Sequence, residues 1–285
     1  MHAHDHGLAA DLEAMMNMGS NRRRSLRWLL AGAATLPLIA CGGGSDSTST
    51  GGSASSGSST GTGSTGATTG SCSVIPEETG GPYPGDGTNS NASGIVNVLT
   101  QTGVVRSDIR SSFNGASGTA GGIPLTIKLK IVNANNGCGA AGEFAVYLWH
   151  CGREGRYSLY SSGVTDQNYL RGVQGADANG DLSFTTIFPG CYDGRMPHVH
   201  FEVYRSLAQS TSASNRIKTS QFTFPMATLN EVYATSGYSS SASNLSRINY
   251  ATDNIFSDGY SLQLVTISGN VADGYIATLT VAVAA

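Results

Sequence analysis

Short runs of alternating apolar and polar residues recur from residue 72 to the C-terminus, separated by Gly, Asn, Asp and Ser. In the run 125–132, aliphatic residues alternate with Lys128 and Lys130. Successive side chains of a strand point to opposite faces, so this pattern predicts a strand with one buried face. The run 144–149 is apolar throughout and predicts a more deeply buried strand.

The same criteria predict further strands bounded by turn residues. They cover residues 182–187, 198–204, 219–224, 262–267 and 275–283, and a hairpin across 269–274 joins the last two. Only residues 227–234 have a helical pattern. About seven strands with long loops predict one all-β domain, a β-sandwich with little helix whose core surrounds an inserted site.

The first forty residues have the three parts of an export leader. A basic block, Arg22-Arg23-Arg24 with Arg27, precedes an apolar run, 28–40, that is too short to span a bilayer. The basic block resembles a twin-arginine export signal, and Leu38-Ile39-Ala40-Cys41 resembles a bacterial lipobox, which implies lipidation of Cys41. An ordinary Sec signal or an uncleaved anchor is the alternative.

A linker is expected to follow, because 27 of the 30 residues from 42 to 71 are Gly, Ser or Thr. We therefore expect a leader (1–40), a lipidated Cys41 with a flexible linker (41–71) and a folded domain (72–285). The domain would be exported to the periplasmic or extracellular side and held at the membrane by the lipid alone.

Charge excludes one class of partner. The formal net charge is −3 and no basic run occurs outside the leader, so nucleic acid is not expected to bind. The tract Met1-His2-Ala3-His4-Asp5-His6 could bind metal by composition, but it lies in the leader and is assigned no role. Whether the domain forms a homo-oligomer is left open.

The folded domain contains four cysteines, Cys72, Cys138, Cys151 and Cys191. An even number of cysteines in an exported protein predicts disulfides, with three possible pairings.

The candidate chemistry begins with His198 and His200, a His-x-His pair on a predicted strand. The strand period of two places both imidazoles on one face, where they can chelate one ion. Tyr192 lies six residues before His198, and Tyr157 lies just after the strand at 144–149. A phenol binds as phenolate only to a strongly Lewis-acidic cation, so two Tyr with two His favour ferric iron over zinc.

These residues resemble the intradiol ring-cleavage dioxygenases, whose iron is held by two Tyr and two His in this chain order. The resemblance covers most of residues 72–285. It is carried by Asn168-Tyr169-Leu170-Arg171-Gly172, Asp177-Ala178-Asn179-Gly180, Phe184-Thr185-Thr186-Ile187-Phe188-Pro189-Gly190, Gly194-Arg195-Met196-Pro197-His198-Val199-His200-Phe201, and the entry segment Pro76-Glu77-Glu78-Thr79-Gly80-Gly81-Pro82-Tyr83.

The resemblance implies a non-heme Fe(III) site with Tyr157 and His198 as equatorial ligands and Tyr192 and His200 as axial ligands. It further implies that Gly81, Pro82, Tyr83 and Arg195 line the substrate, that Gln221 forms hydrogen bonds beside it, and that Tyr192 takes up a substrate proton. The implied reaction cleaves a catechol-type ring with O2 to a cis,cis-muconate-type product.

Cys191 departs from the family pattern, which often has a bulky aromatic residue there. A disulfide at this position would brace the Tyr192 turn or alter the depth of the pocket.

Two other functions remain open. The domain could be a catalytically silent sandwich that binds phenolics or a partner, or a zinc hydrolase that uses the His pair with Glu202. Arg171 is either a site residue or a solvated rim charge.

Overall fold

The computed structural model describes residues 72–285, so the predicted leader, Cys41 and the linker lie outside the described residues. The strands are β1 (Asp86–Asn91), β2 (Gly94–Asn97), β3 (Pro124–Asn133), β4 (Gly139–Ala140), β5 (Ala145–Trp149), β6 (Arg171–Gly175), β7 (Asp181–Ile187), β8 (His198–Tyr204), β9 (Arg216–Thr223), β10 (Thr266–Asn270) and β11 (Gly274–Val283). The α-helices are α3 (Met226–Tyr233) and α4 (Ser239–Leu245), and single 3-10 turns occur at Ala134–Asn136, Ala213–Asn215 and Phe256–Asp258. The prediction of an all-β domain with little helix is confirmed.

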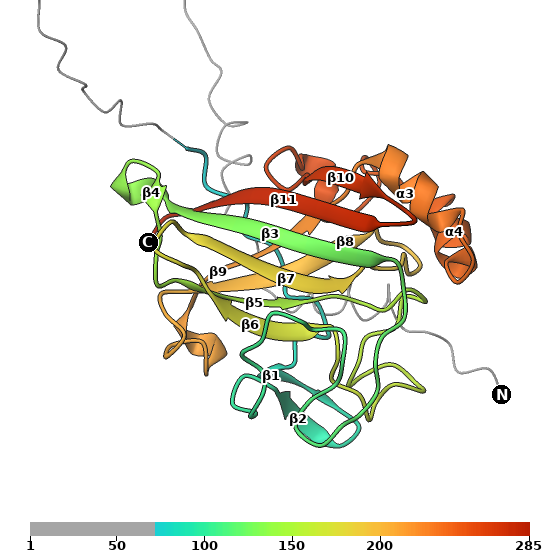
Figure 1. Cartoon of the computed structure of the whole chain (residues 1–285), viewed down its shortest axis with the longest axis horizontal. Coiled ribbons are helices and arrows are strands. Elements are labelled where there is room, and N and C mark those ends of the chain that lie inside the picture. Colours follow the sequence, from blue (N-terminus) through green and yellow to red (C-terminus); the bar gives the residue numbers. More distant parts are fainter. Residues whose placement is uncertain (1–71) are drawn as a thin grey trace, which may run out of the picture. The chain divides into compact units, whose positions relative to one another are not determined.

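Two sheets form the sandwich (Figure 1). The five-stranded sheet has the order β10-β11-β3-β4, with β7 paired to β3, so β3 (green) runs between β11 (red) and β7 (yellow). The four-stranded sheet has the order β6-β5-β8-β9 and is antiparallel throughout. The hairpin β1–β2 is separate from both sheets.

The four-stranded sheet is buried on both faces. Val199 and Phe201 of β8 pack into the main core with Ile127 of β3 from the other sheet. The opposite face carries Tyr147 and Trp149 of β5, which belong to a second apolar cluster. Burial on both faces explains why every residue of β5 and β8 is inaccessible to solvent.

Several predicted elements need correction. Residues 227–234 do not form the only helix, because α4 is a second one, and its Ser-rich sequence gives no apolar pattern beyond the buried Leu245. Residues 262–265 are not part of the predicted strand: β10 starts at Thr266, and Leu264 forms only an isolated bridge with Thr223. Among the described residues, no helix is long and apolar enough to cross a bilayer.

The four cysteines form one disulfide, Cys72–Cys138, and two buried thiols. The predicted disulfide at Cys191 is wrong: its side chain belongs to the main core, whereas that of Cys151 belongs to the second cluster. The Cys191 thiol instead donates to the Arg195 carbonyl, 3.3 Å away. Burial raises the pKa of both thiols to about 12, which keeps them protonated and unreactive.

Removing the disulfide is expected to destabilise the domain. It joins cysteines 66 residues apart, and loop-closure entropy assigns such a cross-link about 4 kcal/mol. The Cys72→Ser/Cys138→Ser variant should melt about 10 °C below the wild type when unfolding is followed by circular dichroism. Reduced wild-type protein is the control and should melt with the variant. If neither shifts, the cross-link does not stabilise the domain.

Candidate metal centre

The structure brings the four predicted metal ligands together. The Nε2 atom of His198 lies 3.0 Å from Nε2 of His200, 3.4 Å from the hydroxyl of Tyr157 and 3.3 Å from the hydroxyl of Tyr192. Both histidines lie on the face of β8 that is turned away from the main core. The cluster therefore sits outside the sandwich core, not within it as the sequence predicted.

The four side-chain atoms are arranged in a way that suits ligands of a bound cation better than partners in a hydrogen-bond network. Nδ1 of His198 lies 2.6 Å from the Met196 carbonyl, which can only accept, so Nδ1 carries the proton and Nε2 of the neutral ring is bare. Three polar atoms therefore converge on one lone pair. One cation among two phenol oxygens and two imidazole nitrogens would satisfy all of them, and the phenol oxygens favour a hard trivalent ion.

Both histidines are held neutral. Burial and the Arg195 charge lower the pKa of His198 well below its usual value. Burial, His198 and Arg195 do the same for the pKa of His200. Neutral imidazoles are the form that binds metal, so few protons compete for these nitrogens near neutral pH.

Aromatic packing fixes the ligand rings. The Trp149 ring stacks on the His200 ring at 5.0 Å with an interplanar angle of 2°. The loop after β5 supplies Tyr157, and two residues later Leu159 adopts a left-handed φ of 74°. Such a conformation is costly for a side chain of this size and is often found where function constrains the backbone.

A buried ion pair lies beside the donors. Nε of Arg195 lies 3.0 Å from the Asp253 carboxylate, and both side chains are at most 1% exposed. Asp253 also accepts from the backbone N–H groups of Met196, Ile255 and Phe256. The sequence indicated Arg195 but not Asp253, which lies in an irregular segment with no motif around it.

Gln221 links Arg195 to the entry segment. Its Oε1 accepts from Arg195 at 2.8 Å, and its Nε2 donates to the Thr79 carbonyl at 2.8 Å. The register of β8 and β9 pairs Gln221 with His200, so the 207–216 insertion does not displace it. The entry segment runs alongside β9 and is hydrogen-bonded to it. At its end, the centre of the Tyr83 ring lies 5.1 Å from that of the Tyr157 ring.

Arg171 is not a solvated rim charge. It is 1% exposed, and its guanidinium donates to the Pro84 carbonyl at 2.7 Å and to the Ser158 side chain and carbonyl, each at 3.1 Å. It therefore ties the end of the entry segment to the residue after Tyr157.

The arrangement of Glu202 argues against a zinc hydrolase. Its carboxyl accepts from the Tyr204 hydroxyl at 2.5 Å. Burial and the neighbouring Asp86 carboxylate raise the pKa of Glu202 to about 8, and a protonated carboxyl is a poor ligand. Within residues 72–285, no three His, Cys, Asp or Glu side chains are grouped to hold a metal, so a metal here depends on the tyrosines.

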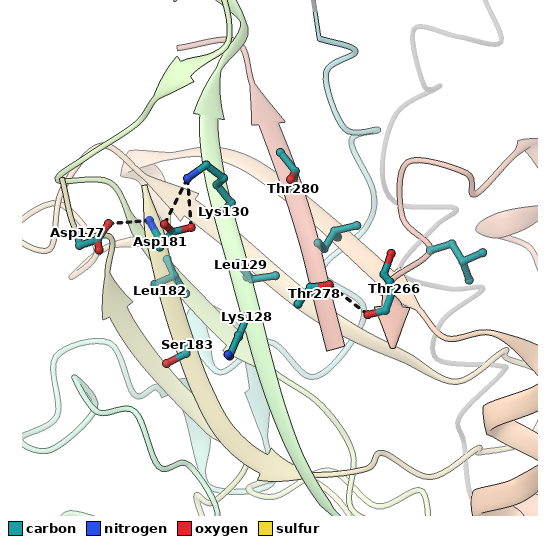
Figure 2. A pocket seen from close by; sticks show the side chains of 12 residues that line it. Lys128, Leu129, Lys130, Asp177, Asp181, Leu182, Ser183, Thr266, Thr278 and Thr280 are labelled. Atoms are coloured by element: carbon teal, nitrogen blue, oxygen red, sulfur yellow. Dashed lines mark hydrogen bonds and ion pairs between the residues drawn. The ribbon is translucent and has the colours of Figure 1, made fainter. Parts of the chain in front are cut away.

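A groove of about 610 Å³ opens on the five-stranded sheet, not on the sheet that carries the histidines. Figure 2 shows Lys130 of β3 reaching to Asp181 of the neighbouring strand β7 in this groove. The polar rim belongs to an exposed ion pair, and the groove is no part of the candidate centre.

Comparisons with known proteins agree with the fold. Residues 105–205, which contain all four donors, match the family model described as "Dioxygenase". An intradiol ring-cleavage dioxygenase from Tetranychus urticae is 24% identical, with 75% of this chain and 95% of that chain covered at a TM-score of 0.57. The described domain has the fold of an intradiol ring-cleavage dioxygenase. The resemblance stated from the sequence is thus confirmed.

Two further matches have lower sequence identity and TM-scores below 0.5. The dioxygenase domain of a dioxygenase carbohydrate-binding protein fusion from Streptomyces sp. SirexAA-E is 20% identical, with 74% of this chain and 99% of that chain covered at a TM-score of 0.46. Catechol 1,2-dioxygenase from Pseudomonas arvilla C-1 is 18% identical, with 69% and 62% covered at a TM-score of 0.41. No curated protein matches the sequence.

Neutralising Asp253 is expected to destabilise the protein strongly. Asp253→Asn keeps the shape but leaves the buried Arg195 charge without its carboxylate, a change that typically costs about 3–5 kcal/mol. The free energy of unfolding in urea measures this loss. The matched control is Asp181→Asn in the exposed pair with Lys130, which should cost less than about 1 kcal/mol. Equal losses would contradict the assigned role of the buried pair.

Acid is expected to weaken the fold through His150. Burial lowers its pKa from 6.5 to about 4 while its ring bonds the Cys151 carbonyl and Thr186. The unfolded chain takes up a proton at a higher pH than the folded chain, so stability is complete above 6.5 and falls as the pH drops toward about 4, by at most about 3 kcal/mol. Urea unfolding across this window should show a shallower pH slope for His150→Gln. An unchanged slope would exclude His150 as a source of the acid sensitivity.

Proposed function

We propose that this protein is a non-heme Fe(III) intradiol dioxygenase that cleaves a catechol-type ring with O2 to a cis,cis-muconate-type product. The observation that carries the proposal is that two phenol oxygens, of Tyr157 and Tyr192, and Nε2 of His200 all lie within 3.4 Å of Nε2 of His198. The fold shared with intradiol ring-cleavage dioxygenases supports the same assignment.

Tyr157, Tyr192, His198 and His200 would hold the iron. When bound, Fe(III) would supply a Lewis acid that favours phenolate and catecholate anions and accepts electron density from the ring. The two tyrosines differ in exposure, because Tyr157 is buried and Tyr192 is half-buried. We therefore assign to the Tyr192 oxygen, which would be a phenolate as an iron ligand, the uptake of a proton that the catechol releases, which gives the neutral tyrosine phenol.

Arg195 supplies positive potential. Its charge lowers the pKa of both His198 and His200, so it acts electrostatically at the donor cluster. The same potential favours a catecholate and the negative charge that develops during ring cleavage. Asp253 and Gln221 hold the guanidinium in place, so little reorganisation is needed when the substrate binds. Gly81, Pro82 and Tyr83 would line the substrate.

We also propose that the protein is exported and anchored through a lipid on Cys41. The Cys72–Cys138 disulfide supports export, since disulfides persist mainly in oxidising compartments.

The purified protein should contain stoichiometric iron and a visible band from tyrosinate-to-iron charge transfer, and it should consume O2 with a catechol. Tyr157→Phe is expected to weaken the band and abolish ring cleavage, because it removes one phenolate donor. Visible spectra, metal analysis and oxygen uptake over a panel of catechols measure these outcomes.

Tyr260→Phe is the matched control, since Tyr260 stacks on Tyr250, away from the donors, and the variant should keep both iron and colour. A colourless zinc protein would overturn the proposal. A coloured protein that binds catechol without consuming O2 would be the silent binding module.

A further inference from the structure

Asn89 of β1 forms a bridge between two segments that flank the donor cluster. Its side-chain N–H donates to the Pro82 carbonyl in the entry segment. Its side-chain oxygen accepts from the Tyr160 hydroxyl at 2.6 Å. Tyr160 lies three residues beyond Tyr157, so one amide connects the entry segment to the loop that supplies a predicted ligand.

The two segments that Asn89 connects also contact each other through Tyr83. The centre of the Tyr83 ring lies 5.1 Å from that of Tyr160 and 5.1 Å from that of Tyr157. Tyr160 is supported in turn by the Arg171 guanidinium, 5.5 Å from its ring centre. The position of Tyr83 over Tyr157 therefore depends on where Asn89 holds Tyr160 and Pro82.

The backbone before Tyr83 needs such a support. Gly80 and Gly81 have no side chains to pack, and Gly81 adopts a left-handed φ of 67°.

Two hydrogen-bonded carbonyl groups hold the backbone on either side of these glycines. The Thr79 carbonyl accepts from Gln221, and the Pro84 carbonyl accepts from Tyr147 and Arg171. Asn89 fixes the Pro82 carbonyl between these two points.

We propose that Asn89 and Tyr160 are positioning residues that set the separation of Tyr83 from Tyr157 and thereby select which ring substituents the site accepts. The proposal rests on the proposed function for its substrate class, and its contacts lie outside the donor set. Because Tyr83 is one of the residues expected to line the substrate, a fixed Tyr83 favours an unsubstituted catechol. A mobile Tyr83 admits a bulkier one.

Three variants separate the two ends of the bridge. Asn89→Asp keeps the acceptor for Tyr160 and loses the donor to Pro82. Tyr160→Phe keeps the ring and loses only the hydroxyl. Asn89→Ala loses both bonds. Asn91→Ala is the matched control, because Asn91 lies on the same strand and donates to the Leu159 carbonyl at 2.8 Å without contacting Pro82 or Tyr160.

Losing one hydrogen bond of this kind should raise the KM for catechol about three- to tenfold while kcat changes less than about twofold. The ratio of kcat/KM for 4-tert-butylcatechol to that for catechol should rise in Asn89→Ala. Adding Tyr160→Phe to Asn89→Ala should cause a smaller further change than Tyr160→Phe causes in the wild type, since the hydroxyl acts partly through Asn89 and keeps only its bond with the Gly85 backbone in Asn89→Ala.

Amide hydrogen exchange provides a readout that needs no turnover. The amides of Gly80, Gly81 and Tyr83 should exchange about fivefold faster in Asn89→Asp than in the wild type, and those of β8 should not change. If the wild type does not turn over, the proposed function fails, and dissociation constants for the two catechols then replace KM in the comparison. The positioning role of Asn89 would be overturned if its variants changed neither the amide exchange rates nor the selectivity between the two catechols. It would also be overturned if Asn91→Ala had an equal effect.

Discussion

Three polar atoms, the hydroxyl oxygens of Tyr157 and Tyr192 and Nε2 of His200, crowd around Nε2 of His198, and the rest of the fold makes that crowding possible. Nδ1 of His198 donates to the Met196 carbonyl, so the lone pair of Nε2 faces all three of these atoms. The four-stranded sheet supplies the histidines from the face opposite the main core. On that face lies the second apolar cluster, which includes Trp149 and Tyr157 with Tyr83 packed against it, and each histidine is 2% exposed.

The electrostatic potential around the four predicted ligands favours bound anions. The fixed Arg195 charge is held by Asp253 in a fully buried pair, and both histidines stay neutral beside it. Burial and the Asp86 carboxylate raise the pKa of Glu202, two residues from His200, to about 8, which reduces its negative charge near neutral pH. A region with a buried guanidinium and neutral imidazoles suits phenolate ligands and a catecholate substrate.

The entry segment is held in place by hydrogen bonds to residues that are distant in the sequence. It is bound to β9 at Glu78 and Thr79, and to Tyr147, Arg171 and Asn89 at its other end. These partners come from distant parts of the chain. Only the folded domain assembles them around Tyr83.

The amino-acid sequence determined what depends on local periodicity. Alternation in 125–132 and 198–204 placed β3 and β8 to within one residue, and the period of two placed His198 and His200 on one face. It did not determine α4, whose Ser-rich residues have no helical pattern, or the start of β10. The order of the two tyrosines and two histidines was readable, but their convergence was not.

Tertiary structure alone decided which side of the sheet carries the site, which cysteines pair and which carboxylate holds Arg195. Cys191 and Cys151 pack into different apolar clusters, and Asp253 reaches Arg195 across 58 residues of chain. Such contacts depend on how the two sheets pack against each other and on where the loops between the strands pass. A period along the chain does not encode them, because they join residues that no local pattern relates.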